Sequence, residues 1–90
     1  MTETPEIRRK RLYMRATHRG IKEMDIIMGH WARVRLGAAD ADLLAIFEEL
    51  LEENDQDLYQ WVSQQAVPPL KYKGIVADLR DLMDKRKDFA

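Results

Sequence analysis

The feature that most constrains this chain is the spacing of its apolar residues. They recur every three or four positions, in stretches that glycine, proline and capping residues divide from one another. That period matches the turn of an α-helix, whereas the alternation of β-strands is never sustained. The pattern therefore predicts an all-α protein. At 90 residues the chain is long enough for a single domain with a shallow core.

Five amphipathic helices with short joins are expected, packed as a compact five-helix bundle. The expected boundaries are, in chain order, Pro5 to His18 or Arg19, Gly20 to Gly37, Asp40 to Asn54, a short helix from Asp55, and Leu70 to Arg86. The sequence shows no internal repeat and no linker long enough to divide the domain. We therefore expect one domain over residues 1–90, with its core between about 5 and 86.

Local signals mark the helix ends. Thr4 is expected to cap the first helix, and Asp40 and Asp55 to cap the third and fourth. Gly20 and Gly37 are expected to end the first and second helices, because glycine enters the left-handed cap conformation without penalty.

The apolar stripes of these helices predict the core. Its expected members are Ile7, part of Leu12, Met14, Met24, Ile27, Met28, Trp31, Leu43, Ile46, Phe47, Leu50, Leu51, Leu58, Trp61, Val62, Tyr72, Ile75, Val76, Leu79, Leu82 and Met83.

The net charge of −1 conceals two opposed blocks. Residues 1–37 hold nine Lys or Arg against four acids, and residues 38–66 hold eight acids and no Lys or Arg. Such blocks predict one basic and one acidic face that steer partners. The basic run 8–11 is interpreted as a solvated, partner-facing helix. Nucleic acid is not an expected partner, because the whole chain is near neutral and no aromatic stacking platform accompanies the run.

Catalytic patterns are missing from the sequence. The two histidines, His18 and His30, are far apart, no GxSxG or phosphate-binding glycine loop occurs, and there is no cysteine for a metal or a disulfide. We therefore predict that the chain is not an enzyme and holds no metal. No apolar run approaches the roughly 18 residues of a membrane span, and the start is not a secretory signal. These features predict a cytoplasmic protein without membrane insertion. We further expect the free chain to be a monomer.

One segment has a pattern of its own: residues 19–25 read Arg-Gly-Ile-Lys-Glu-Met-Asp. Local physics accounts for it, since Arg19 suits the end of one helix, Gly20 suits a turn, and Glu23 suits the first turn of the next helix.

The same segment carries a resemblance. It is similar to the RGxxE motif of the succinate dehydrogenase flavinylation factor family, known in mitochondria as assembly factor two. A basic helix precedes that motif in the family, matched here by Arg-Lys-Arg-Leu-Tyr-Met-Arg at 9–15. A DxDLYxW-like element follows, matched by Asn-Asp-Gln-Asp-Leu-Tyr-Gln-Trp at 54–61. The resemblance covers about residues 8–83. One departure is an aromatic that the family has six positions before the motif glycine, where this chain has Met14 and places Tyr13 one position earlier.

The resemblance implies an assembly factor. Such proteins bind the flavoprotein subunit of succinate dehydrogenase, and in some cases fumarate reductase, and promote attachment of a client histidine to the 8α-methyl group of FAD. The bond-forming chemistry belongs to the client and its FAD. Tight FAD binding by this chain is not expected, because it has no phosphate cradle. The implied client-binding residues are Arg19, Gly20, Glu23 and Asp25, supported by Arg11, Arg15 and His18.

In this hypothesis Arg19 and Glu23 point outward, as a cation and an anion displayed for docking. Asp57, Tyr59 and Trp61 are interpreted as structural residues. The alternative is an antitoxin-like or regulatory protein-binding module unrelated to flavin. A nucleic-acid-binding helical domain is the third candidate.

Overall fold

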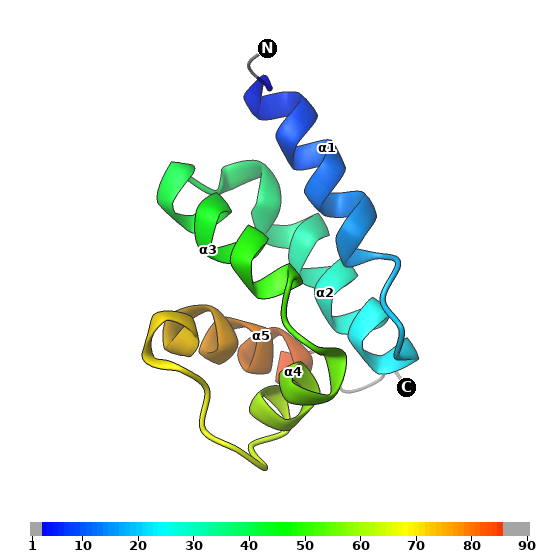
Figure 1. Ribbon diagram of the computed structural model, residues 1–90, viewed down its shortest axis with the longest axis vertical. Coiled ribbons are helices and arrows are strands. Elements are labelled where there is room, and N and C mark those ends of the chain that lie inside the picture. The colour runs from blue at the N-terminus through cyan, green and yellow to red at the C-terminus, as the bar shows by residue number, and fades with distance from the viewer. Residues whose placement is uncertain (1–2, 86–90) are drawn as a thin grey trace.

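Five α-helices and two short 3₁₀ helices form the fold in a computed structural model, which describes residues 3–85 (Figure 1). No strand occurs in that range, so the predicted all-α five-helix architecture is confirmed. The elements are α1 (Pro5–Ala16), α2 (Lys22–Arg35), η1 (Leu36–Ala38), α3 (Ala41–Leu51), α4 (Asp55–Val62), η2 (Leu70–Tyr72) and α5 (Lys73–Lys85).

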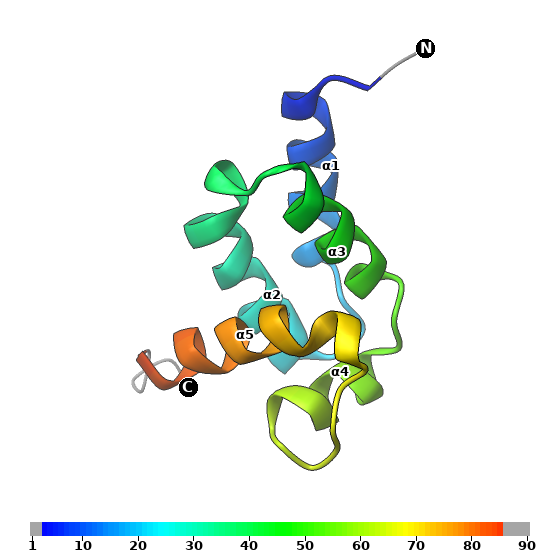
Figure 2. The ribbon, with the colours of Figure 1, turned by 90° about the vertical axis from the view of Figure 1, so that its left-hand side faces the viewer.

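Helix α2 is the central element. It packs against α1, α4 and α5, while α1 also contacts α3. In both ribbon views α1, α2 and α3 lie together in the upper part of the molecule, and α4 and α5 lie in the lower part (Figures 1 and 2). This order brings the α1–α2 connection next to the α3–α4 connection, although some 35 residues separate them along the chain.

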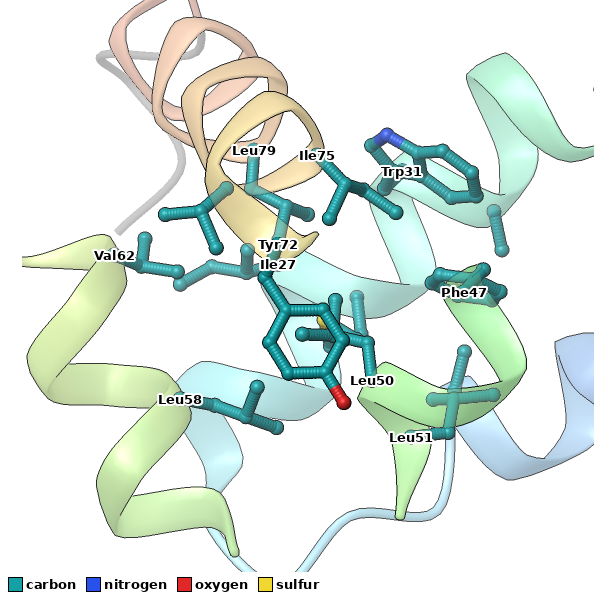
Figure 3. Packing of buried hydrophobic residues seen from close by; sticks show 14 of the residues in the cluster. Ile27, Trp31, Phe47, Leu50, Leu51, Leu58, Val62, Tyr72, Ile75 and Leu79 are labelled. Carbon is teal, nitrogen blue, oxygen red and sulfur yellow. The ribbon is translucent and has the colours of Figure 1, made fainter. Parts of the chain in front are cut away.

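The core lies where the helices meet (Figure 3). Trp31 and Phe47 are fully buried and stack with ring centroids 4.4 Å apart, and Trp61 lies 5.7 Å from the ring of Tyr72. Fully burying an aliphatic or aromatic side chain contributes about 1.5–3 kcal/mol. The stripes predicted for the last four helices are confirmed, with Leu43, Ile46 and Met83 only partly buried.

Helix α1 departs from the prediction. Ile7 and Met14 were expected to face inward, but they are 57% and 54% exposed, while Leu12 is fully buried. Tyr13 packs partly against the core. The expectation was wrong because arginines, not apolar residues, occupy much of the side of α1 that faces α3.

The predicted caps are confirmed at two helices. Thr4 Oγ1 accepts from the Ile7 amide at 3.1 Å, and Asp40 Oδ1 accepts from the Leu43 amide at 2.9 Å. At α4 the cap is Asn54, whose Oδ1 accepts from the Gln56 amide at 2.7 Å, so the prediction of Asp55 was wrong. The carboxylate of Asp55 has other partners.

Gly20 and Gly37 do not end their helices in the left-handed conformation, so that prediction was wrong. Helix α1 ends at Ala16, before Gly20, and α2 runs on into η1, which contains Gly37. No glycine of the described chain has a positive φ. Helix α5 begins at Lys73, after the 3₁₀ turn, and the predicted end at Arg86 lies outside the described residues. No helix within residues 3–85 is long and apolar enough to cross a membrane.

Candidate functional site at the α1–α2 corner

The side chain of Arg19 joins the two neighbouring connections. Its Nε donates to Asp55 Oδ1 at 2.7 Å, its Nη1 to the Leu51 carbonyl at 2.7 Å, and its Nη2 to the Glu53 carbonyl at 3.0 Å. The two carbonyls lie at the end of α3, where helical acceptors lack partners within the helix. Only 10% of the Arg19 side chain is exposed. The expectation that Arg19 points outward was therefore wrong, because the guanidinium satisfies acceptors of its own chain.

Gly20 is held by the same carboxylate. Its amide donates to Asp55 Oδ2 at 2.7 Å. A Cβ placed on Gly20 would lie 3.2 Å from that oxygen, closer than nine in ten real Cβ contacts. Glycine is thus favoured here by a close approach between two connections rather than by its backbone angles.

Asp25 and His18 also make contacts within the corner. Asp25 Oδ1 accepts from the Arg19 amide, which ties the connection to the first turn of α2. His18 is exposed, and its Nδ1 lies 2.7 Å from the Met14 carbonyl. Arg19, Gly20 and Asp25 therefore form one structural unit, with Asp55 as its fourth member.

The supporting arginines of α1 are paired with α3. Arg11 Nη1 lies 3.0 Å from Glu48 Oε2, and Arg15 Nη2 lies 2.6 Å from Glu52 Oε2. Arg8 Nη2 reaches the other oxygen of Glu48 at 3.0 Å. Hydrogen bonds from Arg11, and also from Arg8, lower the pKa of Glu48. The two charge blocks of the sequence thus meet across the α1–α3 contact, where part of each block is paired within the chain.

Glu23 is the motif residue with a free side chain. It lies in the first turn of α2, is exposed, and has no ion pair or hydrogen bond to its side chain within residues 3–85. It lines a groove of about 290 Å³, which we call the α2–α4 groove. The groove residues are Ile21 and Glu23 at the start of α2, Gln56, Tyr59 and Gln60 on α4, and Gln65 just after it.

Sequence reasoning missed Asp55 and Tyr59. Asp55 was assigned a capping role, and its true partners lie 35 and 36 positions away, beyond the reach of local rules. Tyr59 was interpreted as structural, yet it is 37% exposed and lines the groove, whereas Trp61 is buried as expected. Both residues belong to the 54–61 element, so the resemblance was the signal that could have indicated them.

The fold and the corner define a small helical protein whose RGxxE motif is fixed internally, with one exposed carboxylate, that of Glu23. Comparison with known proteins gives its family. Residues 10–83 match the family described as "Flavinator of succinate dehydrogenase". The chain belongs to this family, and the predicted family resemblance is thereby confirmed.

Three relatives bear the name succinate dehydrogenase assembly factor 2, mitochondrial. The Danio rerio protein is 31% identical over 88 residues, covering 96% of this chain and 56% of the relative. The Scheffersomyces stipitis protein is 33% identical over 86 residues, covering 96% and 50%. The Penicillium rubens protein is 37% identical over 59 residues, covering 66% and 19%. The chain thus spans about half, or less, of the length of these curated relatives.

These names correct the predicted cytoplasmic location, because the relatives are mitochondrial proteins. The prediction used the lack of a membrane-spanning apolar run and the lack of a secretory signal in the first residues, most of which precede the matched segment. Neither observation distinguishes the cytoplasm from mitochondria.

Proposed function

We propose that this chain is a non-catalytic assembly factor that binds the flavoprotein subunit of succinate dehydrogenase and promotes covalent attachment of its FAD. Fumarate reductase is the second client to be tested. The observation that carries the proposal is the family match over residues 10–83, which includes the whole α1–α2 corner. The family match also favours this function over the antitoxin-like alternative.

The division of labour follows from the corner. Arg19 and Gly20 are held by Asp55, Asp25 accepts from the Arg19 amide, and Glu23 is left exposed beside them. A carboxylate without a partner of its own can accept from a cationic or amide donor of the client. The chain acts by holding the client's histidine and flavin in a reactive geometry, since correct placement of reacting groups lowers a barrier without new chemistry.

FAD remains with the client in this proposal. FAD supplies the electrophilic 8α-methyl position, and the client supplies the histidine. The α1–α2 corner places no phosphate-binding glycine loop beside Glu23. That this chain does not bind FAD tightly stays a prediction, checked by titrating free FAD and following its fluorescence.

In-gel flavin fluorescence of the client subunit tests the function. Cells that lack their own factor receive either the wild-type chain or Glu23→Lys, and covalent flavin is compared between them. We expect the wild type to restore fluorescence and Glu23→Lys to leave it near the level of the deletion. The matched control is Glu6→Lys, since Glu6 is also an exposed acid in a first helical turn. Full fluorescence with a folded Glu23→Lys chain would remove Glu23 from the docking surface, and no gain from the wild type would refute the function itself.

A further inference from the structure

The α2–α4 groove has a mixed but consistent chemistry. Its single charged group is Glu23, and three glutamines (Gln56, Gln60 and Gln65) and the ring of Tyr59 supply most of the remaining lining. A glutamine amide both donates and accepts, so it can pair with the N–H and the C=O of an extended backbone. Tyr59 adds an exposed aromatic face, which suits an aliphatic stem or a cation.

The groove has one charged lining residue, whereas most of the acids on α3 are paired. The acids of α3 are largely neutralised, since Glu48 and Glu52 pair with arginines of α1 and Glu49 pairs with Lys71. Asp55 at the corner is likewise occupied by Arg19. Glu23 is the one charged residue that lines the groove and has no ion pair within residues 3–85, although the exposed Lys22 lies next to it in the chain. The complementary part of a ligand therefore carries a positive charge.

The two walls of the groove are fixed to each other. The Asp55 contacts with Arg19 and Gly20 tie the connection before Ile21 to the first residue of α4. At the other end, α4 closes with a residue in the left-handed conformation, Gln64, at φ 68°. The Gln65 amide then donates back to the Gln60 carbonyl at 2.8 Å, which places Gln65 on the groove. A preformed groove binds an extended segment without a large ordering cost to itself.

We infer that the α2–α4 groove binds an extended segment of the client that carries a lysine or arginine. The cation lies against Glu23, the segment's backbone pairs with the glutamines, and the stem of the basic residue packs on Tyr59. This inference rests on the proposed function and extends it from the motif corner to helix α4.

Affinity measurements test it. Purified flavoprotein subunit with non-covalently bound FAD is titrated with the wild-type chain and with Tyr59→Ala, Glu23→Ala and the double variant. We expect each single change to weaken binding about tenfold, as for a residue at the centre of an interface. The double variant should lose clearly less than the product of the two, because both residues contact one segment. Val34→Ala is the control, since Val34 is 47% exposed on α2 and lies outside the groove lining.

A charge exchange identifies the ligand. Each lysine or arginine on the surface of the client is changed to glutamate, and the variants are tested with Glu23→Lys. Recovery of binding by one such pair supports the inference and names the basic residue. Wild-type affinity for a folded Tyr59→Ala chain, or purely multiplicative losses in the double variant, would overturn the inference that the client segment binds in the groove. Loss of binding in Glu23→Ala alone would leave the proposed function standing, whereas a wild-type chain that fails to bind the subunit removes both.

Discussion

Arg19 of the RGxxE motif forms an ion pair with Asp55, which ties the α1–α2 connection to the start of α4. The Nε–Oδ1 distance is 2.7 Å, and the two side chains are 10% and 16% exposed. The pair joins the α1–α2 connection to the α3–α4 connection, which are far apart in the sequence. Because the pair fixes the residues just before α2, it also positions Glu23 in the first turn of α2, a helix without a side-chain cap.

The first prediction concerns this tether. Asp55→Ala should lower the free energy of unfolding by about 3 kcal/mol, since removing one partner leaves a mostly buried guanidinium without its counter-ion. Asp55→Asn keeps the shape and should cost less. Urea denaturation followed by circular dichroism gives the values. If Asp55→Ala and wild type unfold at the same urea concentration, the tether does not stabilise the fold.

A second prediction separates the two possible roles of Gly20. Its φ is not positive, so alanine meets no backbone penalty, but the added Cβ would press on Asp55 Oδ2 at 3.2 Å. Gly20→Ala should therefore destabilise the chain by about 1 kcal/mol, as for modest overpacking.

The control for this change is Gly74→Ala. Gly74 lies in α5 with nothing within 4 Å of its Cβ position, so alanine should stabilise the helix by up to about 1 kcal/mol. Thermal unfolding of the two variants should shift in opposite directions. A stabilising Gly20→Ala would show that the contact with Asp55 relaxes freely.

Local physics predicted much of the fold because its causes are local. Thr4 and Asp40 cap the helices they precede, and the apolar stripe of α5 faces the core as its spacing requires. Helix α1 was misjudged because Ile7 and Met14 fit a helical stripe, but the acids of α3 decide which side of α1 turns inward.

The candidate site was predictable only in part, because some of the contacts that fix it come from residues far away in the sequence. The motif pointed to the α1–α2 corner, and Glu23 is exposed there as expected. The direction of Arg19 could not be deduced, because both its carbonyl partners and Asp55 come from another connection. From sequence alone, an arginine beside a glycine is equally consistent with binding a partner and with an internal ion pair. Only the positions of its acceptors distinguish the two.

A third prediction uses the strained end of α4. Gln64 occupies the left-handed position of a Schellman cap, in which its own amide donates to the Trp61 carbonyl at 3.3 Å. An L-residue with a side chain pays roughly 1 kcal/mol in this conformation relative to glycine. Gln64→Gly should therefore raise the free energy of unfolding by about that amount, measured by urea denaturation. Gln65→Gly is the control and should lower it, since only Gln64 among the described non-glycine residues has a positive φ.

The last prediction concerns pH and the pairing of α1 with α3. Hydrogen bonds from Arg11 and Arg8, opposed by partial burial, lower the pKa of Glu48 below its ordinary 4.5. A carboxyl whose pKa is lower in the folded than in the unfolded state stabilises the fold above the unfolded value, and this contribution disappears as the pH falls through the folded value. Glu48→Gln should thus be less stable than wild type by about 1 kcal/mol at pH 7, as for an ion pair open to solvent. The difference should shrink as the pH falls below 4.5, whereas Asp84→Asn, at an exposed acid of α5, should show no such loss. Urea midpoints between pH 3 and pH 7 measure the effect, and an equal gap between Glu48→Gln and wild type at both ends would show that packing, rather than charge, joins these two helices.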